Sequence, residues 1–301
     1  MKFSNIIRLH WAALRALLVL TVIVGIGYPL VIWLVAQIPG LKDKADGSIV
    51  DVGGKPVASR LIGQLFTDDK GNALPQYFQS RPSAAGTGYD PLATSASNLG
   101  PENIVDTPGD PSQPADSNGY KASLLSLVCS RSKAIGDLEG VNGTRPFCTG
   151  DGVGAVLAVI GPRDARGNVV RPTQVVSVNE PCETTKQPFL ATYEGVRVEC
   201  AKFGEDYSLG QIVPIKGAAS NPAVPADAVT ASGSGLDPDI SPAYADLQIA
   251  RVAKTRGVSV EDIRQAVAAH TDGRTLGIFG EPRVSVVELN IALDEKFPMK
   301  S

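Results

Sequence analysis

The residues of this 301-residue sequence that most readily do chemistry are its four cysteines, Cys129, Cys148, Cys182 and Cys200. No two of them form a C-x-x-C pair, and both histidines of the chain lie outside the stretch that holds them. Zinc sites use closely spaced thiolates with histidines nearby, so this spacing argues against a metal site. An even number of cysteines in a translocated domain instead predicts two disulfides. The nearest-neighbour scheme, Cys129 to Cys148 and Cys182 to Cys200, is one of three possible connectivities.

The catalytic motifs in the sequence are incomplete. Residues 150–155, Gly-Asp-Gly-Val-Gly-Ala, lack the preceding strand and following helix of a dinucleotide-binding loop, and no G-x-x-x-x-G-K-[ST] phosphate loop occurs. The turn Ser232–Gly235 has serine where the G-x-S-x-G elbow needs its first glycine. His270 stands in the last turn of a predicted helix, where an imidazole complements the helix dipole. We therefore predict no catalytic residue, no metal site and no cofactor bound by this chain alone.

One element dominates the rest of the chain, the run from Ala16 to Ala36, in which 21 consecutive residues carry no charge. A helix of this length spans about 30 Å, the thickness of the hydrocarbon core of a bilayer. The run is longer than the apolar region of a signal peptide, which usually has about 7–15 residues. Trp33 stands where small residues would mark a cleavage site. Pro29 predicts a kink, either fitted to a neighbouring helix or without a partner. We expect one retained transmembrane helix in contact with membrane lipid.

The charges on either side of this helix predict its orientation. Three basic residues precede it and two follow closely, so the positive-inside rule favours a cytoplasmic N-terminus, by a small margin, and a large extracytoplasmic domain. Disulfides persist on an oxidising side of the membrane, so two disulfides would also place the domain outside the cytoplasm. Beyond residue 40 there are 25 Lys and Arg against 31 Asp and Glu, a net charge of −6 that argues against a nucleic-acid partner.

The domain beyond the helix is predicted to be mixed α/β (α+β) and rich in loops, since the chain holds 31 Gly and 22 Pro. We expect a short tail and membrane helix over 1–37, a linker over 38–56 and the extracytoplasmic domain over 57–301. Val57 to Phe66 predicts a strand, and Tyr120 to Ile135 has helical spacing. Four Val-rich segments bounded by Gly or Pro predict further strands, at 153–160, 168–179, 190–203 and 211–215.

The last seventy residues carry clear boundary signals. Ser241 and Pro242 predict a helix start, and Gly257 its end. A second helix is expected after Ser259, ending near 271–273, because acidic residues fill its first turn. Finally, residues 287–293 alternate between apolar and more polar types, which predicts a half-buried strand.

Several uncommon sequence words, in a fixed order, resemble the C subunit family of the bacterial Kdp-type potassium-transporting ATPase. The resemblance covers roughly residues 1–135 and 222–296. Its blocks include Leu-Ile-Gly-Gln-Leu-Phe (61–66), Tyr-Phe-Gln-Ser-Arg-Pro-Ser-Ala (77–84), Ser-Asn-Leu-Gly-Pro (97–101), Val-Thr-Ala-Ser-Gly-Ser-Gly-Leu-Asp-Pro-Asp-Ile-Ser-Pro (229–242), Gln-Ile-Ala-Arg-Val-Ala (248–253), Gly-Glu-Pro-Arg-Val (280–284) and Glu-Leu-Asn-Ile-Ala-Leu-Asp (288–294).

The resemblance implies an accessory subunit of a high-affinity potassium uptake complex in the bacterial cell membrane. Its partners would be a channel-like potassium-binding subunit and a P-type ATPase subunit that carries the phosphorylated aspartate, with ATP and potassium bound by the complex. The family description adds a chaperone-like increase in ATP affinity, with Gln248 as the nucleotide contact. A domain outside the cell cannot touch cytoplasmic ATP, so in that orientation Gln248 contacts a partner or the core, and any effect on nucleotide affinity travels by conformational coupling.

Part of the chain departs from this family pattern, a Val-rich insert at about 136–222 that holds three of the cysteines. The insert is either a surface insertion that disulfides stabilise, without a binding role, or a surface on which a partner docks. For partner contacts we expect two rigid loops and one further residue, namely Arg81, Pro82, Ser83, Asn98, Ser232, Gly233, Ser234, Gly235 and Asp237. The alternative function is a membrane-anchored extracytoplasmic binding or sensor domain that acts alone.

Overall fold

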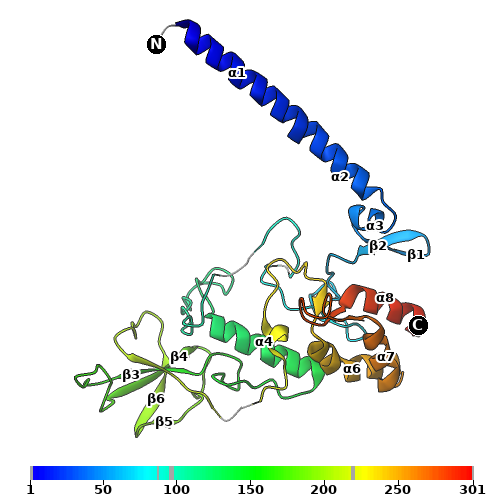
Figure 1. Cartoon of the computed structure of the whole chain (residues 1–301). Helices are drawn as coiled ribbons and strands as arrows, with labels where there is room; N and C mark the ends of the chain where they lie inside the picture. The colour runs from blue at the N-terminus through cyan, green and yellow to red at the C-terminus, as the bar shows by residue number, and fades with distance from the viewer. Residues whose placement is uncertain (1–2, 87, 95–97, 218–220, 300–301) are drawn as a thin grey trace. The chain divides into compact units, whose positions relative to one another are not determined.

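The computed structural model describes residues 3–86, 88–94, 98–217 and 221–299. It divides the chain into two compact units, Met1–Ile62 and Gly63–Ser301 (Figure 1). The architecture is mixed α/β with one N-terminal apolar helix, which confirms the predicted fold class.

The first unit contains a continuous helical stretch in three parts: α1 (Phe3–Val22), the π-helical turn η1 (Ile23–Gly27) and α2 (Tyr28–Ala36). Residues Ser4–Ala36 are long and apolar enough to cross a membrane, and an 18-residue window within them has a mean hydropathy of 2.5. The expected disturbance at Pro29 takes the form of the π turn directly before it. Proline has no N–H to donate to the carbonyl four residues earlier, and a wider turn accommodates that break.

The remainder of this unit is a short helix α3 (Lys42–Ala45) and a hairpin of β1 (Ile49–Val52) and β2 (Lys55–Ser59). Two glycines with positive φ form its two-residue turn, as twisted hairpins require. The strand predicted over 57–66 is wrong beyond Ser59. The Ser59 hydroxyl donates to the Gly47 carbonyl (2.6 Å) and accepts from the Leu61 amide (3.2 Å), which turns the chain out of the ladder.

The second unit has a helical core. It contains α4 (Leu124–Glu139), α5 (Ala226–Val229), α6 (Pro242–Arg256), α7 (Val260–Ala269) and α8 (Val286–Lys296). A small antiparallel sheet joins them, in the order β8 (Asp239–Ile240), β10 (Arg283–Ser285) and β9 (Thr271–Asp272). The largest side chains fully buried in this core include Phe78, Ile263, Leu289 and Leu293.

The ends of α6 and α7 follow the sequence signals. The Ser241 hydroxyl accepts from the Tyr244 amide (3.0 Å), and Gly257 closes α6 with φ of 67°. Ser259 caps α7 in the same way. The strand predicted over 287–293 is wrong, because the segment forms α8. Its buried face, Val286, Leu289, Asn290 and Leu293, repeats at helical spacing, whereas Ile291 of the alternating set is only half-buried.

A five-stranded mixed sheet forms most of the insert, in the order β5 (Thr192–Tyr193), β6 (Val196–Ala201), β4 (Gln174–Pro181), β3 (Val156–Ile160) and β7 (Gln211–Pro214). The pair β4 and β6 is parallel and the other pairs are antiparallel. All four Val-rich segments contain strands, as predicted.

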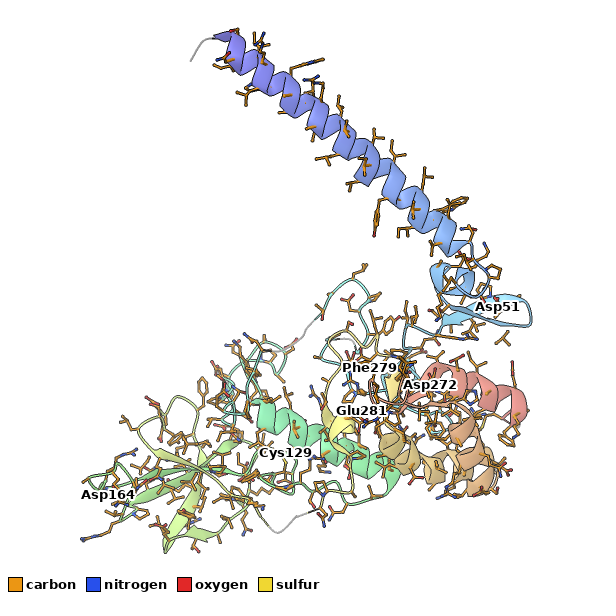
Figure 2. The ribbon with its side chains drawn as sticks, viewed as in Figure 1. Asp51, Cys129, Asp164, Asp272, Phe279 and Glu281 are labelled. Atoms are coloured by element: carbon orange, nitrogen blue, oxygen red, sulfur yellow. A yellow bond between two sulfur atoms is a disulfide. The ribbon has the colours of Figure 1, made fainter. Side chains whose placement is uncertain are left out.

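Helix α4 joins this sheet to the helical core, with Leu125 packed against the sheet and Ile135 in the core. It runs from Leu124 to Glu139, rather than from 120 to 135. Two disulfides hold the surrounding loops, Cys129–Cys148 and Cys182–Cys200, with Cys129 on α4 (Figure 2).

Candidate functional site

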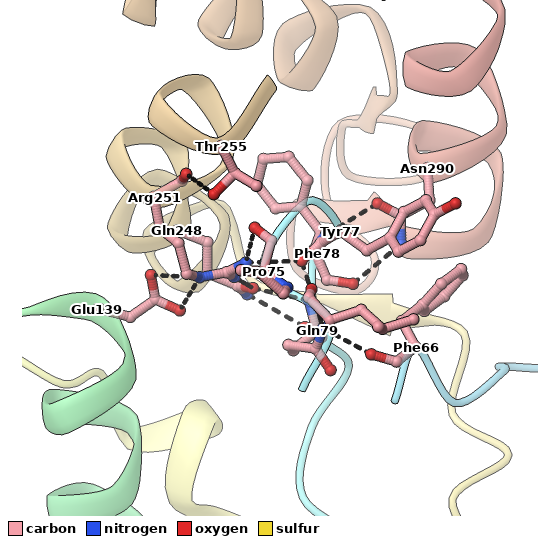
Figure 3. Close-up of polar contacts among 11 residues, drawn as sticks. Phe66, Pro75, Tyr77, Phe78, Gln79, Glu139, Gln248, Arg251, Thr255 and Asn290 are labelled. Carbon is pink, nitrogen blue, oxygen red and sulfur yellow. Dashed lines mark hydrogen bonds and ion pairs between the residues drawn. The ribbon is translucent and has the colours of Figure 1, made fainter. Parts of the chain in front are cut away.

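The most elaborate polar structure in the second unit holds the loop segment 75–79, which begins in a turn (Figure 3). The amide of Asn290 accepts from the Phe78 N–H and donates to the Phe78 carbonyl, both at 2.9 Å. The side-chain amide of Gln248 likewise accepts from the Gln79 N–H (2.7 Å) and donates to the Gln79 carbonyl (3.1 Å). Two side-chain amides, one from α6 and one from α8, therefore satisfy the backbone groups of Phe78 and Gln79, which lie outside any strand or helix.

Arg251 closes this arrangement from α6. One of its terminal nitrogens donates to the Pro75 (2.6 Å) and Tyr77 (2.9 Å) backbone carbonyls, and the other to the side-chain Oε1 of Gln248 (2.9 Å). Its Nε pairs with Glu139 of α4 at 3.0 Å, in a contact where the Glu139 side chain is fully buried. Burial raises the pKa of Glu139, and the guanidinium opposes that rise. The pair ties α4 to the segment that α6 holds.

Arg256 holds the other side of the segment. Its side chain is completely buried, its Nε donates to the Gln76 carbonyl (2.8 Å), and one terminal nitrogen pairs with Asp294 (2.8 Å). The guanidinium lies 5.2 Å from the ring centre of Tyr77, whose hydroxyl donates to the same carboxylate. We call the set Glu139, Gln248, Arg251, Arg256, Asn290 and Asp294 the backbone clamp.

The two loops expected to contact partners lie against each other. Residues Ser83 and Ser232 form a parallel bridge, in which Ala84 donates to the Ser232 carbonyl and Ser232 to the Pro82 carbonyl, both at 2.8 Å. Ser232 is 2% exposed, and its hydroxyl accepts from the Gly235 amide (3.0 Å). These contacts make the pair of loops rigid.

An open groove of about 390 Å³ follows these loops, with Arg81 and Asp237 as an ion pair on its wall. Its other charged groups are Asp227, Asp239, Glu281 and Arg283. Burial raises the pKa of Asp239, although its ion pair with Arg283 (3.1 Å) opposes that rise. The groove presents mostly carboxylates around two guanidinium groups, a surface suited to polar recognition.

The structure brings together most of the residues expected at partner contacts. They differ in exposure, and only some of them line the groove. Arg81 and Asp237 line the groove, Pro82, Ser83, Gly233 and Ser234 are half-buried beside it, and Ser232 and Gly235 are buried. Asn98 is exposed on a different loop.

Gln248 is 0% exposed, and both ends of its amide are occupied by the chain's own backbone. Sequence reasoning missed the rest of the clamp. The signal was present, since Arg251 lies in the Gln-Ile-Ala-Arg-Val-Ala block and Asn290 in the Glu-Leu-Asn-Ile-Ala-Leu-Asp block.

A second hollow, of about 460 Å³, lies between the loop 106–120 and the insert, where residues of β4 and the end of β6 line it. Asp106 lines it and is 6% exposed. Its carboxylate accepts from the Ser123 amide and from the hydroxyls of Tyr120 and Ser126, at 2.8 to 3.1 Å. Within the ranges that the structure describes, no group of three or more His, Cys, Asp or Glu side chains is placed to hold a metal ion.

Comparison with known proteins gives consistent matches. A family model described as "KdpC: K+-transporting ATPase, c chain" matches residues 10–106 and 209–295. A potassium-transporting ATPase KdpC subunit from Kineococcus radiotolerans is 33% identical over 298 residues, which cover 99% of both chains. Those of Streptomyces avermitilis and Streptomyces coelicolor are 36% and 37% identical, and the alignments cover 97% and 98% of this chain and 96% and 95% of theirs.

These alignments also bear on the insert. The family model leaves residues 107–208 unmatched, whereas the three relatives align over nearly their whole length. Chains with a counterpart of the insert therefore occur among these relatives, and the insert is not peculiar to this sequence.

Proposed function

This chain belongs to the KdpC family, the c chain of K+-transporting ATPases, and we propose that it is a non-catalytic accessory subunit of an ATP-driven potassium uptake complex. A channel-like subunit and a P-type ATPase subunit supply the ion path and ATP hydrolysis. This chain supports their assembly and coupling.

The observation that carries the proposal is what the family's polar residues contact. Gln248, Arg251 and the neighbouring Arg256 bond to the backbone of residues 75–79. Their other partners also belong to this chain: Gln248 and Arg251 bond to each other, and the two arginines reach the Leu293 and Phe297 carbonyls, the buried Glu139 carboxylate and the half-exposed Asp294 carboxylate. Side chains held this way are not presented to a substrate. They fix the shape of a surface, which is what an assembly subunit requires.

The surface so fixed is the groove beside Arg81 and Asp237, which we assign to a partner subunit. Exposed ion pairs at such a surface set register and association rate more than affinity. The apolar helix Ser4–Ala36, with its π turn, supplies a second contact within the membrane. Turns of this kind are frequent at functional sites of helices.

The orientation with a cytoplasmic N-terminus and an extracytoplasmic domain belongs to the same proposal. It is supported by the basic residues before the helix and by two disulfides, which persist on an oxidising side. In this orientation any influence on ATP affinity is transmitted through the complex.

The test is deletion and rescue in the host. Deleting the gene for this chain should abolish high-affinity potassium uptake, and the full chain should restore it and co-purify with two large membrane proteins whose ATPase activity potassium stimulates. Uptake that persists without this chain would refute the proposal. Thiol labelling of intact cells after mild reduction tests orientation, because outward cysteines then react with an impermeant reagent.

A second candidate function rests on the hollow between the loop 106–120 and the insert, where the buried Asp106 carboxylate and Tyr120 line a space large enough for a small solute. A stand-alone sensor would bind a specific ligand there. Titration calorimetry of the full chain in detergent against cations and small solutes tests this alternative, and absence of heat counts against it.

A further inference from the structure

The loop between β9 and β10, residues 273–282, presents three large apolar side chains to solvent. Leu276 is 84% exposed, Ile278 70% and Phe279 61%. They lie within four residues of one another in one short loop, and Figure 2 labels Phe279 beside Asp272 and Glu281. Large apolar side chains gathered on one exposed loop mark an interaction site more often than scattered ones do.

Contacts within the loop fix the conformation in which these side chains are exposed. Arg274 and Glu281 form an ion pair (2.7 Å) across its base, and β9 pairs with β10 just below. The amides and carbonyls of Thr275 and Phe279 bond reciprocally, at 2.9 and 3.0 Å. Leu276 adopts φ of 55°, in the left-handed region that a leucine rarely occupies. At 84% exposure this leucine gains little packing within the fold to offset the cost of that conformation.

We propose that this loop inserts its apolar tip into the interfacial region of the bilayer that holds the anchor helix. The apolar helix ends at Ala36, and the second unit begins at Gly63. The 26 residues between them reach at most about 90 Å when fully extended, and less because they contain α3 and a hairpin. The domain therefore stays near the membrane, where a tethered contact needs little affinity of its own.

Within the loop, only Glu281 and Pro282 at its base line the groove assigned to a partner, so the apolar tip is a separate surface. The small size of that tip favours lipid over a protein partner. A stable protein interface buries about 800 Å² on each side, far more than three side chains provide. A few apolar side chains do suffice to hold a tethered domain at the headgroup boundary.

The charges beside the loop predict which lipids it accepts. Arg274 is paired with Glu281, and Arg283 with Asp239 and Asp272. Because these basic groups already have carboxylate partners, insertion should not require anionic lipid and should resist salt. The proposal depends only on the anchor helix, so it stands or falls separately from the potassium-pump assignment.

The test places a reporter on the loop of the full chain in phosphatidylcholine vesicles. Trp11 and Trp33, the only native tryptophans, are replaced by Phe, and Phe279→Trp becomes the sole emitter. We expect blue-shifted emission that is quenched by acyl-brominated phosphatidylcholine, equally at low and high salt. The matched control is Leu209→Trp, an 81% exposed residue of the insert, which should remain unquenched.

Two further variants separate insertion from simple proximity. In the Phe279→Trp background, Ile278→Glu should abolish quenching and Ile278→Leu should keep it, with unchanged circular dichroism in both. Three results would overturn the proposal: no quenching of Trp at 279, equal quenching at 209, or, in the complex purified from membranes with a genetically encoded fluorescent amino acid at 279, blue-shifted emission of that amino acid that brominated lipid does not quench. The last would assign the loop to a protein partner.

Discussion

Replacing Gln248 by leucine tests whether its amide holds the backbone of the core. The change keeps the side chain's approximate size and helix propensity and removes the three hydrogen bonds at 2.7, 2.9 and 3.1 Å. The Gln79 backbone amide and carbonyl then lose their partners in a half-buried site, beside a side chain that is itself 0% exposed. We expect the free energy of unfolding of the second unit to fall.

The size of this fall can be worked from the contacts. Each buried polar group left without a partner costs about 1–3 kcal/mol, and two such groups remain on Gln79. Arg251 loses one of several bonds and keeps the rest, while the leucine regains part of the loss by apolar burial. The net destabilisation should be about 2–4 kcal/mol, which lowers the melting temperature of a domain this large by roughly 4–16 °C.

The assay is thermal unfolding of the full chain in detergent, followed by circular dichroism. Its matched control is Gln265→Leu, the same substitution on the exposed face of α7, where the amide makes only a 3.4 Å contact with Glu261. That variant should unfold within about 0.5 kcal/mol of the parent chain.

One pair of results would refute this reasoning. If Gln248→Leu melts together with Gln265→Leu, and the assembled pump loses ATP affinity only with the former, then Gln248 contacts nucleotide and not the backbone. If both stability and ATP affinity fall, rescue of affinity on cooling identifies the loss as a folding defect.

Three more predictions follow from other parts of the second unit. Gly235→Ala should cost at least about 1 kcal/mol of stability in urea unfolding, because φ is 80° and a Cβ would meet the Gly88 carbonyl oxygen, whereas Gly273→Ala should be close to neutral. Burial and a neighbouring carboxylate raise the pKa of Tyr120 to about 12. An unfolded tyrosine loses its proton near pH 10, so stability should fall between about pH 10 and 12, and Tyr120→Phe should weaken that fall in urea midpoints measured against pH. Cys182→Ser opens a loop of 18 residues, which should cost about 3 kcal/mol and speed proteolysis of the insert before that of the helical core.

Element boundaries set by local chemistry were predictable from sequence. A serine before Pro242 and a glycine after Arg256 satisfy the free groups at the two ends of α6 whatever the rest of the chain does. The apolar run at Ala16–Ala36 was equally clear, although its helix begins at Phe3 because polar residues flanking a membrane helix also form helical turns.

The segment 286–296 shows where local reasoning fails. Its apolar residues satisfy both an alternating and a helical pattern, and only the neighbours decide between them. Burial of Val286, Leu289 and Leu293 in one core selects the helix, with Asn290 on the same face. In the sequence, Asn290 was interpreted as part of the polar face of a strand. In the structure its side chain is buried and bonds to the backbone of Phe78.

The backbone clamp was beyond prediction because its contacts join residues far apart in the chain. Gln248 lies 169 residues from Gln79, and Asn290 lies 212 residues from Phe78. No spacing rule connects such positions. The resemblance to a family pointed to the right blocks, and the fold shows that they contact one another.

The same separations determine the order in which this protein can mature. At about 5–20 residues per second, residues 75–79 leave the ribosome roughly 10–30 s before α6 follows. Throughout that interval Phe78, which ends 0% exposed, faces water with its backbone groups unpaired. A chain that ends before Pro242 lacks most residues of the backbone clamp. Such unfinished copies keep apolar surface exposed and remain substrates for chaperones and proteases. Only completed copies present the rigid groove.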